Sequence, residues 1–282
     1  MPGSWHRWQL TAPLAAVSRP VRADLPATPA PATAPAAPSP VGIPVHLGGA
    51  PARQVDETTC GSAVLVMLAA TGDPVLATWL ETGALPDSAG LPPEVPLERD
   101  GLDAAGRFAA AQERVKAATG RRALGPLPWP AAYGTPPWTA AREARFPGVR
   151  YRVRPLDDGS RGGASVLAAV RSATLRGIPV PLYTGGDLRS GLATAVPRHV
   201  VLAVPLPAGA RDAAADVLHL YEPGRGTVYR VRTEDLLDRT EPHPALGGWA
   251  HVVAALLPVL DRLRPAGAHT TLGETIGGTH ER

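Results

Sequence analysis

The sequence of 282 residues predicts an α+β fold, in which a buried helix packs on a mostly antiparallel β-sheet. Two observations support this prediction. A long apolar helical pattern comes first, near residues 60–70, and several short strand-like runs follow in the second half of the chain. With 44% hydrophobic and 19% charged residues, the chain also has enough apolar side chains to form a folded domain.

Three segments are expected along the chain. Residues 1–50 are rich in proline and alanine, above all from residue 11 onward, and predict a disordered, extended tether. Residues 51–262 are expected to form the domain, with an insert at 83–150, and residues 263–282 a flexible tail. On composition, a simple linker is favoured over a docking motif for a proline-binding module in the tether.

The first half of the domain is expected to be helical. Residues Cys60–Ala70 are apolar on every side, so a helix here must be buried on all sides, and the following Thr-Gly-Asp-Pro sequence ends it. The remaining elements of this half are a helix at Pro74–Thr82, Pro-rich loops at 83–100 and 121–137, and a helix at Leu102–Thr119 between them.

The second half is expected to supply the sheet. A helix at Ala164–Arg176 ends at Gly177, which suits a helix C-terminus. The strand at Ile178–Tyr183 is expected at an edge or end of the sheet, because Pro179 and Pro181 lack amide donors. Further strands are expected at 198–205, 216–222, 227–231 and 249–256, with a short helix beginning at Thr233.

Charge and composition exclude several classes of protein. The 28 basic and 25 acidic residues give a net charge of +3, and no basic run alternates with aromatic residues, so no nucleic-acid surface is expected. A membrane span needs about 20 consecutive apolar residues, and none is present. The weak apolar stretch at the N-terminus favours a cytoplasmic location over secretion. The single cysteine excludes a disulfide framework and a Cys-rich metal site, so neither a metal nor another cofactor is expected.

The single cysteine is the first candidate for chemistry. Cys60 lies at the predicted start of the buried helix, where the helix N-terminus stabilises a thiolate and a histidine can take the proton. The competing interpretation is that a lone cysteine simply fills the core. Gln54, six residues upstream, favours the first interpretation, because its side-chain amide can share with the Cys60 backbone amide the binding of a developing oxyanion.

These residues resemble the papain-like cysteine peptidase superfamily, in particular the branch of double-glycine leader peptidases. In that branch a glutamine precedes a Cys-Gly-Pro-Ala helix start, and a His-x-Val-Val strand precedes an Asp-Pro turn. The matching residues here are Gln54, Cys60-Gly61-Ser62-Ala63, the Gly-Ile-Pro-Val run at 177–180, His199-Val200-Val201-Leu202 and Glu222-Pro223. The resemblance covers about 54–82 and 164–257 and implies a papain-like fold. Ser62 and Glu222 depart from the family's proline and aspartate.

Strand register brings a histidine and a carboxylate together. If residues 198–205 and 216–222 form a hairpin with Pro205 opposite Asp216, His199 lies directly opposite Glu222. Glu222 is then expected to accept the Nδ1 proton of His199 and to leave Nε2 facing Cys60. A slip of one residue would place the two side chains on opposite faces of the sheet.

Together these residues predict a papain-like cysteine hydrolase, most plausibly a peptidase with a peptide or protein substrate. Cys60 is the expected nucleophile, His199 its proton partner, Glu222 the group that orients the imidazole, and Gln54 part of the oxyanion hole. Two alternatives stay open: an acyl transferase with the same residues, and an inactive papain-like module that binds peptides. The sequence does not specify the substrate or the oligomeric state.

Three other features have competing interpretations. His251 is expected to be a packed core residue, because its neighbours are apolar. Gly48-Gly49 resembles a leader-type cleavage site, although such pairs are common in a chain with 30 glycines. The insert carries Trp129 and Trp138 and is expected to wall the substrate cleft, although aromatic residues flanked by proline also serve as internal anchors of a loop.

Overall fold

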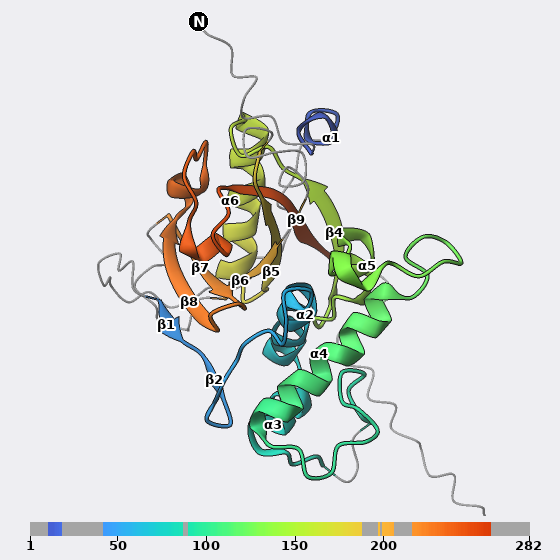
Figure 1. Ribbon diagram of the computed structural model, residues 1–282. Coiled ribbons are helices and arrows are strands. Elements are labelled where there is room, and N and C mark those ends of the chain that lie inside the picture. Colours follow the sequence, from blue (N-terminus) through green and yellow to red (C-terminus); the bar gives the residue numbers. More distant parts are fainter. Residues whose placement is uncertain are drawn as a thin grey trace, which may run out of the picture.

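The computed structural model describes residues 11–18, 42–86, 90–187, 197, 199–205 and 216–260. Over these residues the chain is an α+β fold, as the sequence predicts, with one large antiparallel sheet between helices on both of its faces (Figure 1). The helices are α1 (Ala12–Ala16), α2 (Cys60–Gly72), α3 (Pro74–Thr82), α4 (Ala104–Gly120), α5 (Pro137–Glu143) and α6 (Arg161–Leu175), with short 3-10 turns η2 (Ala131–Tyr133), η5 (Thr233–Leu236) and η6 (Pro244–Leu246).

The large sheet has seven strands in the order β1-β8-β7-β6-β5-β9-β4, and each neighbouring pair is antiparallel. Its strands are β1 (Ile43–Pro44), β4 (Val149–Pro155), β5 (Val180–Gly185), β6 (His199–Val204), β7 (Val217–Glu222), β8 (Thr227–Arg232) and β9 (His251–Leu260). A separate small hairpin pairs β2 (His46–Leu47) with β3 (Ala50–Pro51).

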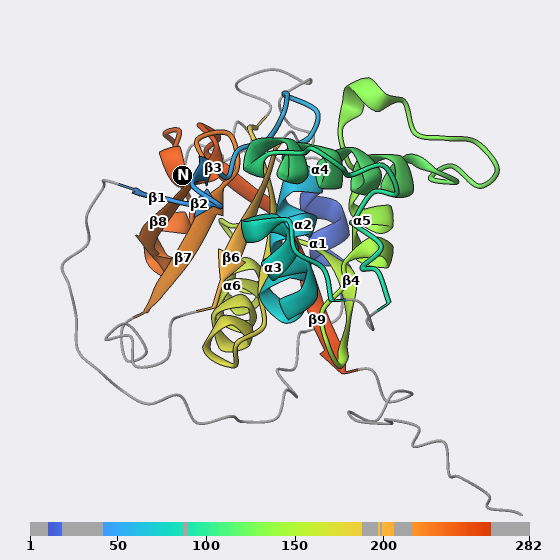
Figure 2. The same cartoon turned by 90° about the horizontal axis from the view of Figure 1, so that it is seen from below.

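Alternation along the strands divides the core into two parts. Successive strand side chains point to opposite faces of a sheet. On β6, Val200 and Leu202 join the cluster that contains α2, whereas Val201 and Ala203 join the cluster that contains α6. The sheet therefore separates α2 to α5 from α6 (Figure 2).

Helix α2 is the centre of the first cluster. Nine of its thirteen residues are buried, which confirms that a helix this apolar lies inside the protein. It packs on β5 and β6 on one side and on α3, α4 and α5 on the others. Because α2 starts at Cys60, the burial of the helix also holds that residue in the interior.

The expected edge position of the Ile178–Tyr183 strand is wrong. The corresponding strand, β5, lies inside the sheet between β6 and β9. Pro181 pairs with Leu202 of β6, but the pairing with β9 starts only at Leu182. The proline therefore has a partner strand on one side only, which is where a missing amide donor is tolerated.

The chain is also more regular than expected near two predicted boundaries. Helix α1, strands β1 and β2 and the first residue of β3 lie within residues 1–50, for which the sequence predicts an extended tether. The rest of that segment and the expected tail at 263–282 lie outside the described residues. Within and beside the insert, α5 and β4 are regular elements that were not expected.

Within the described residues, no single helix meets the length and apolarity required to cross a membrane. Helices α2 and α3 would meet those criteria only when taken together, and they meet at a bend of 115°.

Candidate active site

Cys60 is the first residue of α2, and its exposed fraction is 4%. No side chain caps this end of the helix. Thr59, the residue before Cys60, instead uses its hydroxyl within the preceding turn, where it donates to the Asp56 carbonyl at 2.9 Å. The partial positive charge of a helix N-terminus therefore acts on Cys60.

His199 begins β6, which is separated from the sheet's end strand β4 by β5 and β9. It pairs with Thr184 of β5, whose buried hydroxyl donates to the Leu246 carbonyl at 3.0 Å. The next residue, Gly247, lies against the imidazole: a Cβ there would be 2.3 Å from His199 Cδ2 and 2.6 Å from Nε2. The ring thus rests on a glycine that Thr184 helps to hold in place.

Glu222 lies at the end of β7 and contacts His199, as predicted, with 2.8 Å between Oε1 and Nε2. The expected register is wrong by two residues. The observed pairs are Leu202 with Tyr221 and Val204 with His219, so Glu222 lies diagonally from His199 and not directly opposite. A shift of two residues keeps both side chains on the same face, and therefore the contact survives the error.

The expected orientation of the imidazole is also wrong. The carboxylate of Glu222 meets Nε2 of His199, not Nδ1, which leaves Nδ1 for the hydrogen bond with Cys60. Burial alone would lower the pKa of His199, but the hydrogen bonds to Cys60 and Glu222 and the charges of both groups raise it to about 9. A protonated ring between two acidic groups is the charge state that this arrangement stabilises.

Glu222 is held by the turn that follows it. Its carboxylate accepts the Gly224 amide at 2.7 Å and the Arg225 amide at 2.9 Å. Burial favours the neutral acid, but the hydrogen bond from His199, its charge and the two amides lower the pKa of Glu222 below its ordinary value. These amides hold the carboxylate over the turn that follows β7, which accommodates the extra methylene relative to aspartate. Gly224 is required here, because a Cβ would lie 2.9 Å from Oε1.

Gln54 connects the turn after Glu222 to the turn before Cys60. Its backbone amide donates to the Pro223 carbonyl at 2.9 Å, next to Glu222. Its side-chain Nε2 donates to the Asp56 carbonyl at 2.7 Å, the same oxygen that Thr59 binds beside Cys60. One Nε2 hydrogen remains for another acceptor, and the buried Oε1 has no hydrogen-bond partner among the described residues.

Gln112, which the sequence did not single out, fixes the position of Gln54. This fully buried side chain of α4 accepts the Val55 amide at 3.1 Å and donates to the Arg53 carbonyl at 3.0 Å. On the other side of the same loop, the Tyr221 hydroxyl donates to the Ala52 carbonyl at 2.7 Å. Loop 52–55 is therefore attached both to α4 and to the strand that carries Glu222.

Thr135 is a second residue that the sequence did not single out. It lies directly against the start of α2, because a Cβ on Gly61 would be 2.6 Å from Thr135 Cβ. Its carbonyl accepts the Tyr183 hydroxyl at 3.0 Å, and burial together with the charge of Cys60 raises the pKa of Tyr183. Thr135 belongs to the insert, so the insert reaches the candidate nucleophile.

Asp56 and the Gly48-Gly49 pair both have roles in the local structure. The Asp56 carboxylate accepts the amide and the hydroxyl of Thr58, each at 2.7 Å, and lies 3.7 Å from Lys116 Nζ. Gly48 and Gly49 form the turn of the β2–β3 hairpin, both with positive φ. Gly48 is packed against the carbonyl of Glu81, so a Cβ there would be 2.3 Å from it. The turn geometry accounts for both glycines.

His251 is buried, as expected, but it is part of an ionic group and not a simple packing residue. Its Nδ1 lies 3.0 Å from Asp158 Oδ2, and its Nε2 lies 3.7 Å from Asp187 Oδ2. Burial lowers the pKa of His251, but the two aspartates outweigh burial and raise it. Sequence separation hid this group, because Asp158 precedes α6 and His251 starts β9.

Within the described residues, no cluster of three or more His, Cys, Asp or Glu residues is arranged to hold a metal ion. Comparison with models of protein families finds no family that matches this chain, and comparison with curated proteins finds no significant match. The chemistry of the site therefore rests on its own geometry.

Proposed function

We propose that this protein is a cysteine hydrolase of the papain-like type that cleaves amide bonds in peptides or proteins. One observation carries the proposal: a buried imidazole hydrogen-bonds both to a cysteine at a helix N-terminus and to a carboxylate that is itself fixed by two backbone amides. This is the arrangement that nucleophilic catalysis by a thiol needs. A helix that starts with the nucleophile and packs on an antiparallel sheet is also what the papain-like resemblance implies.

The proposed reaction has two steps. The Sγ of Cys60 attacks the carbonyl carbon, and the protonated His199 gives its proton to the departing amine as the C–N bond breaks. Neutral His199 then takes a proton from water, whose oxygen attacks the thioester carbon. The C–S bond breaks and releases the carboxylic acid and the Cys60 thiolate, which restores the starting pair of thiolate and protonated His199. Glu222 keeps the ring oriented through Nε2 in both steps, and a pKa of about 9 keeps His199 able to donate at neutral pH.

Gln54 is proposed to bind the oxyanion of each tetrahedral intermediate together with the Cys60 backbone amide. Its remaining Nε2 hydrogen is the donor for this role. The hydrogen bonds between loop 52–55 and the side chains of Gln112 and Tyr221 support the role, because they hold the loop before substrate arrives. A donor fixed in advance needs no reorganisation during the reaction.

The test is alkylation of Cys60 by iodoacetamide between about pH 5 and 10. An ion-paired thiolate reacts at about pH 6 to 7, where an ordinary thiol is mostly protonated, and we expect this for the wild type. His199→Ala should remove the reactivity at low pH, whereas His46→Ala, which alters an exposed histidine of β2, should leave it unchanged.

Two outcomes would contradict the proposal. One is reaction of Cys60 only above about pH 8.5, the ordinary range of a free thiol, at a rate that His199→Ala does not alter. The other is a thiol that stays unreactive at every pH, as expected for a sulfur enclosed in the core. A peptidyl vinyl sulfone applied to the wild type and to Cys60→Ser then shows whether a peptide reaches the sulfur.

A further inference from the structure

The insert carries a surface formed by the exposed side chains of Leu124, Leu127, Tyr133 and Trp138 and by the half-buried Trp129. The exposed fractions are 62% for Leu127, 66% for Tyr133 and 47% for Trp138. Exposed apolar residues are normal when scattered singly, but a group of them within fifteen residues indicates an interaction site. We call this group the aromatic surface.

The aromatic surface is held in shape by its own contacts. Trp129 packs edge-on against Tyr133 and Trp138, with ring centroids 6.1 Å and 5.3 Å apart. The Trp138 Nε1 donates to the Ala123 carbonyl at 2.8 Å, and the Trp129 amide donates to the Gly120 carbonyl at 2.9 Å. A surface that is already ordered loses little conformational entropy when a partner binds.

The aromatic surface is continuous with the candidate active site. Tyr133 is two residues from Thr135, which contacts Gly61 beside Cys60. Two residues of extended chain span at most about 7 Å. A Cβ on the intervening Gly134 would lie 3.5 Å from the Thr58 carbonyl, so this segment runs along the start of α2.

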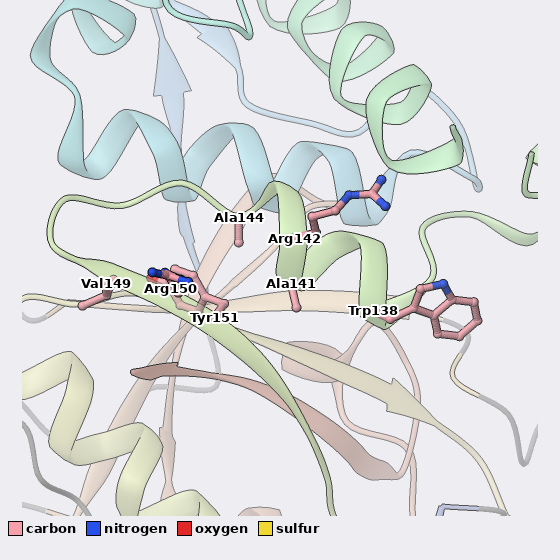
Figure 3. Close-up of a pocket in the computed structure, with 7 residues that line it drawn as sticks. All are labelled: Trp138, Ala141, Arg142, Ala144, Val149, Arg150 and Tyr151. Atoms are coloured by element: carbon pink, nitrogen blue, oxygen red, sulfur yellow. The ribbon is translucent and has the colours of Figure 1, made fainter. Parts of the chain in front are cut away.

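Trp138 of the aromatic surface also lines a pocket of about 370 Å³ between α5 and β4 (Figure 3). Trp138, Arg142 and Tyr151 are among the residues that line it. Residues 121–143 contain three arginines and one acidic residue, Glu143, which pairs with Arg142 at 2.8 Å. The charge beside the aromatic surface is therefore positive, which suits a partner with acidic residues.

We propose that the aromatic surface docks an apolar segment of the polypeptide substrate, flanked by acidic residues, and holds the neighbouring amide bond next to Cys60. This inference rests on the proposed function, since it assigns the substrate segment to that same site. Aromatic side chains supply much of the binding energy in such interfaces, and the arginines add selectivity for acidic sequences.

Fluorescence polarisation tests the docking without any chemistry at the thiol. The probe is fluorescein-labelled Asp-Leu-Phe-Leu-Asp-Ala, and the control probe replaces Leu-Phe-Leu by three alanines. We expect the wild type to bind the first probe at least about tenfold more tightly, and Leu127→Ser/Tyr133→Ser to lose this difference. Leu97→Ser, which alters an even more exposed leucine outside the aromatic surface, should bind as the wild type does.

A second pair of probes connects the aromatic surface to Cys60. These are vinyl sulfones that carry the same two peptides, and their rates of inactivation should differ in the wild type but not in Leu127→Ser/Tyr133→Ser. Iodoacetamide is too small to contact the aromatic surface while it reacts at Cys60. It should therefore react equally with the wild type and with Leu127→Ser/Tyr133→Ser. Equal binding of the two labelled peptides by the wild type would overturn the docking proposal, as would unchanged binding by the double variant.

The failure of the hydrolase proposal gives a different result. Cys60→Ser keeps the aromatic surface, so it should bind the labelled peptide as tightly as the wild type does. An unreactive Cys60 with intact, variant-sensitive peptide binding would reject the hydrolase and retain the docking surface. If Cys60 is reactive and depends on His199 but the protein shows no preference between the two peptides, the docking surface is rejected and the hydrolase proposal is retained.

Discussion

Replacing Gly247 by alanine should separate the imidazole from the carboxylate that orients it. The new Cβ would lie 2.3 Å from His199 Cδ2 and 2.6 Å from Nε2. Carbon atoms in contact are normally at least about 3.5 Å apart, so the ring or the turn must move by about 1.2 Å. The Nε2 to Oε1 distance of 2.8 Å leaves only about 0.7 Å before the hydrogen bond is lost near 3.5 Å.

A displacement of this size predicts a loss of about 100-fold in the rate of Cys60 alkylation near neutral pH, because misplacement of a catalytic group by about 1 Å has effects of that order. The pKa of His199 should fall from about 9 toward its ordinary value as Glu222 moves away. The assay is the pH dependence of iodoacetamide alkylation, together with an NMR titration of the His199 ring.

Gly248→Ala is the matched control. Gly247 and Gly248 both have positive φ, at 69° and 85°, so an alanine at either position meets backbone strain of about 1–2 kcal/mol. Nothing lies within 4 Å of a Cβ at Gly248, so only Gly247→Ala disturbs the imidazole. The reasoning is refuted if both variants alkylate at the same rate and the His199 titration stays at the wild-type pH in each.

Three further predictions concern the support of the site and the loops around it. The pKa of His199 is raised, so its contribution to stability is complete below about pH 6.5 and is lost as the pH rises through about 9. Between pH 8 and 10 the melting temperature of the wild type should therefore fall further than that of His199→Ala. Thr184→Val removes the donor to the buried Leu246 carbonyl and should cost about 1–3 kcal/mol in urea unfolding, whereas Thr184→Ser should restore most of it. Glu94→Gln weakens the two-point contact with Arg145, formed by hydrogen bonds of 3.0 Å and 2.7 Å, and should cost about 2 kcal/mol in the same assay; an unchanged midpoint would show that this ion pair does not hold the insert.

Local pattern was sufficient to predict most of the regular elements. The expected helix at Pro74–Thr82 has the same bounds as α3, because Asp73 caps its start and Gly83 ends it. Strand β4 was missed although Val149, Tyr151 and Val153 alternate with arginines, which is a strand period. The high proline content nearby concealed that signal.

Contacts between distant segments were harder to predict. The pairing of His199 with Glu222 depended on register, and the two-residue error was harmless only because strand faces repeat every two residues. Nothing local indicates that Gln112 bonds to the loop before Cys60, or that Thr135 lies on Gly61. Such contacts arise from tertiary packing, for which a single sequence carries no periodic signal.

The place of β9 in the sheet has a consequence for the order of synthesis. This strand comes last among the described elements, yet it lies between β5 and β4, so it joins two pieces that were translated long before it. A nascent chain that ends before residue 251 lacks the strand that joins β5 to β4, so its large sheet is not yet continuous. Sheets closed by a late central strand fold slowly because distant segments must meet. In a ribosome-bound chain, β4 would therefore have no neighbouring strand until residues 251–260 have been translated.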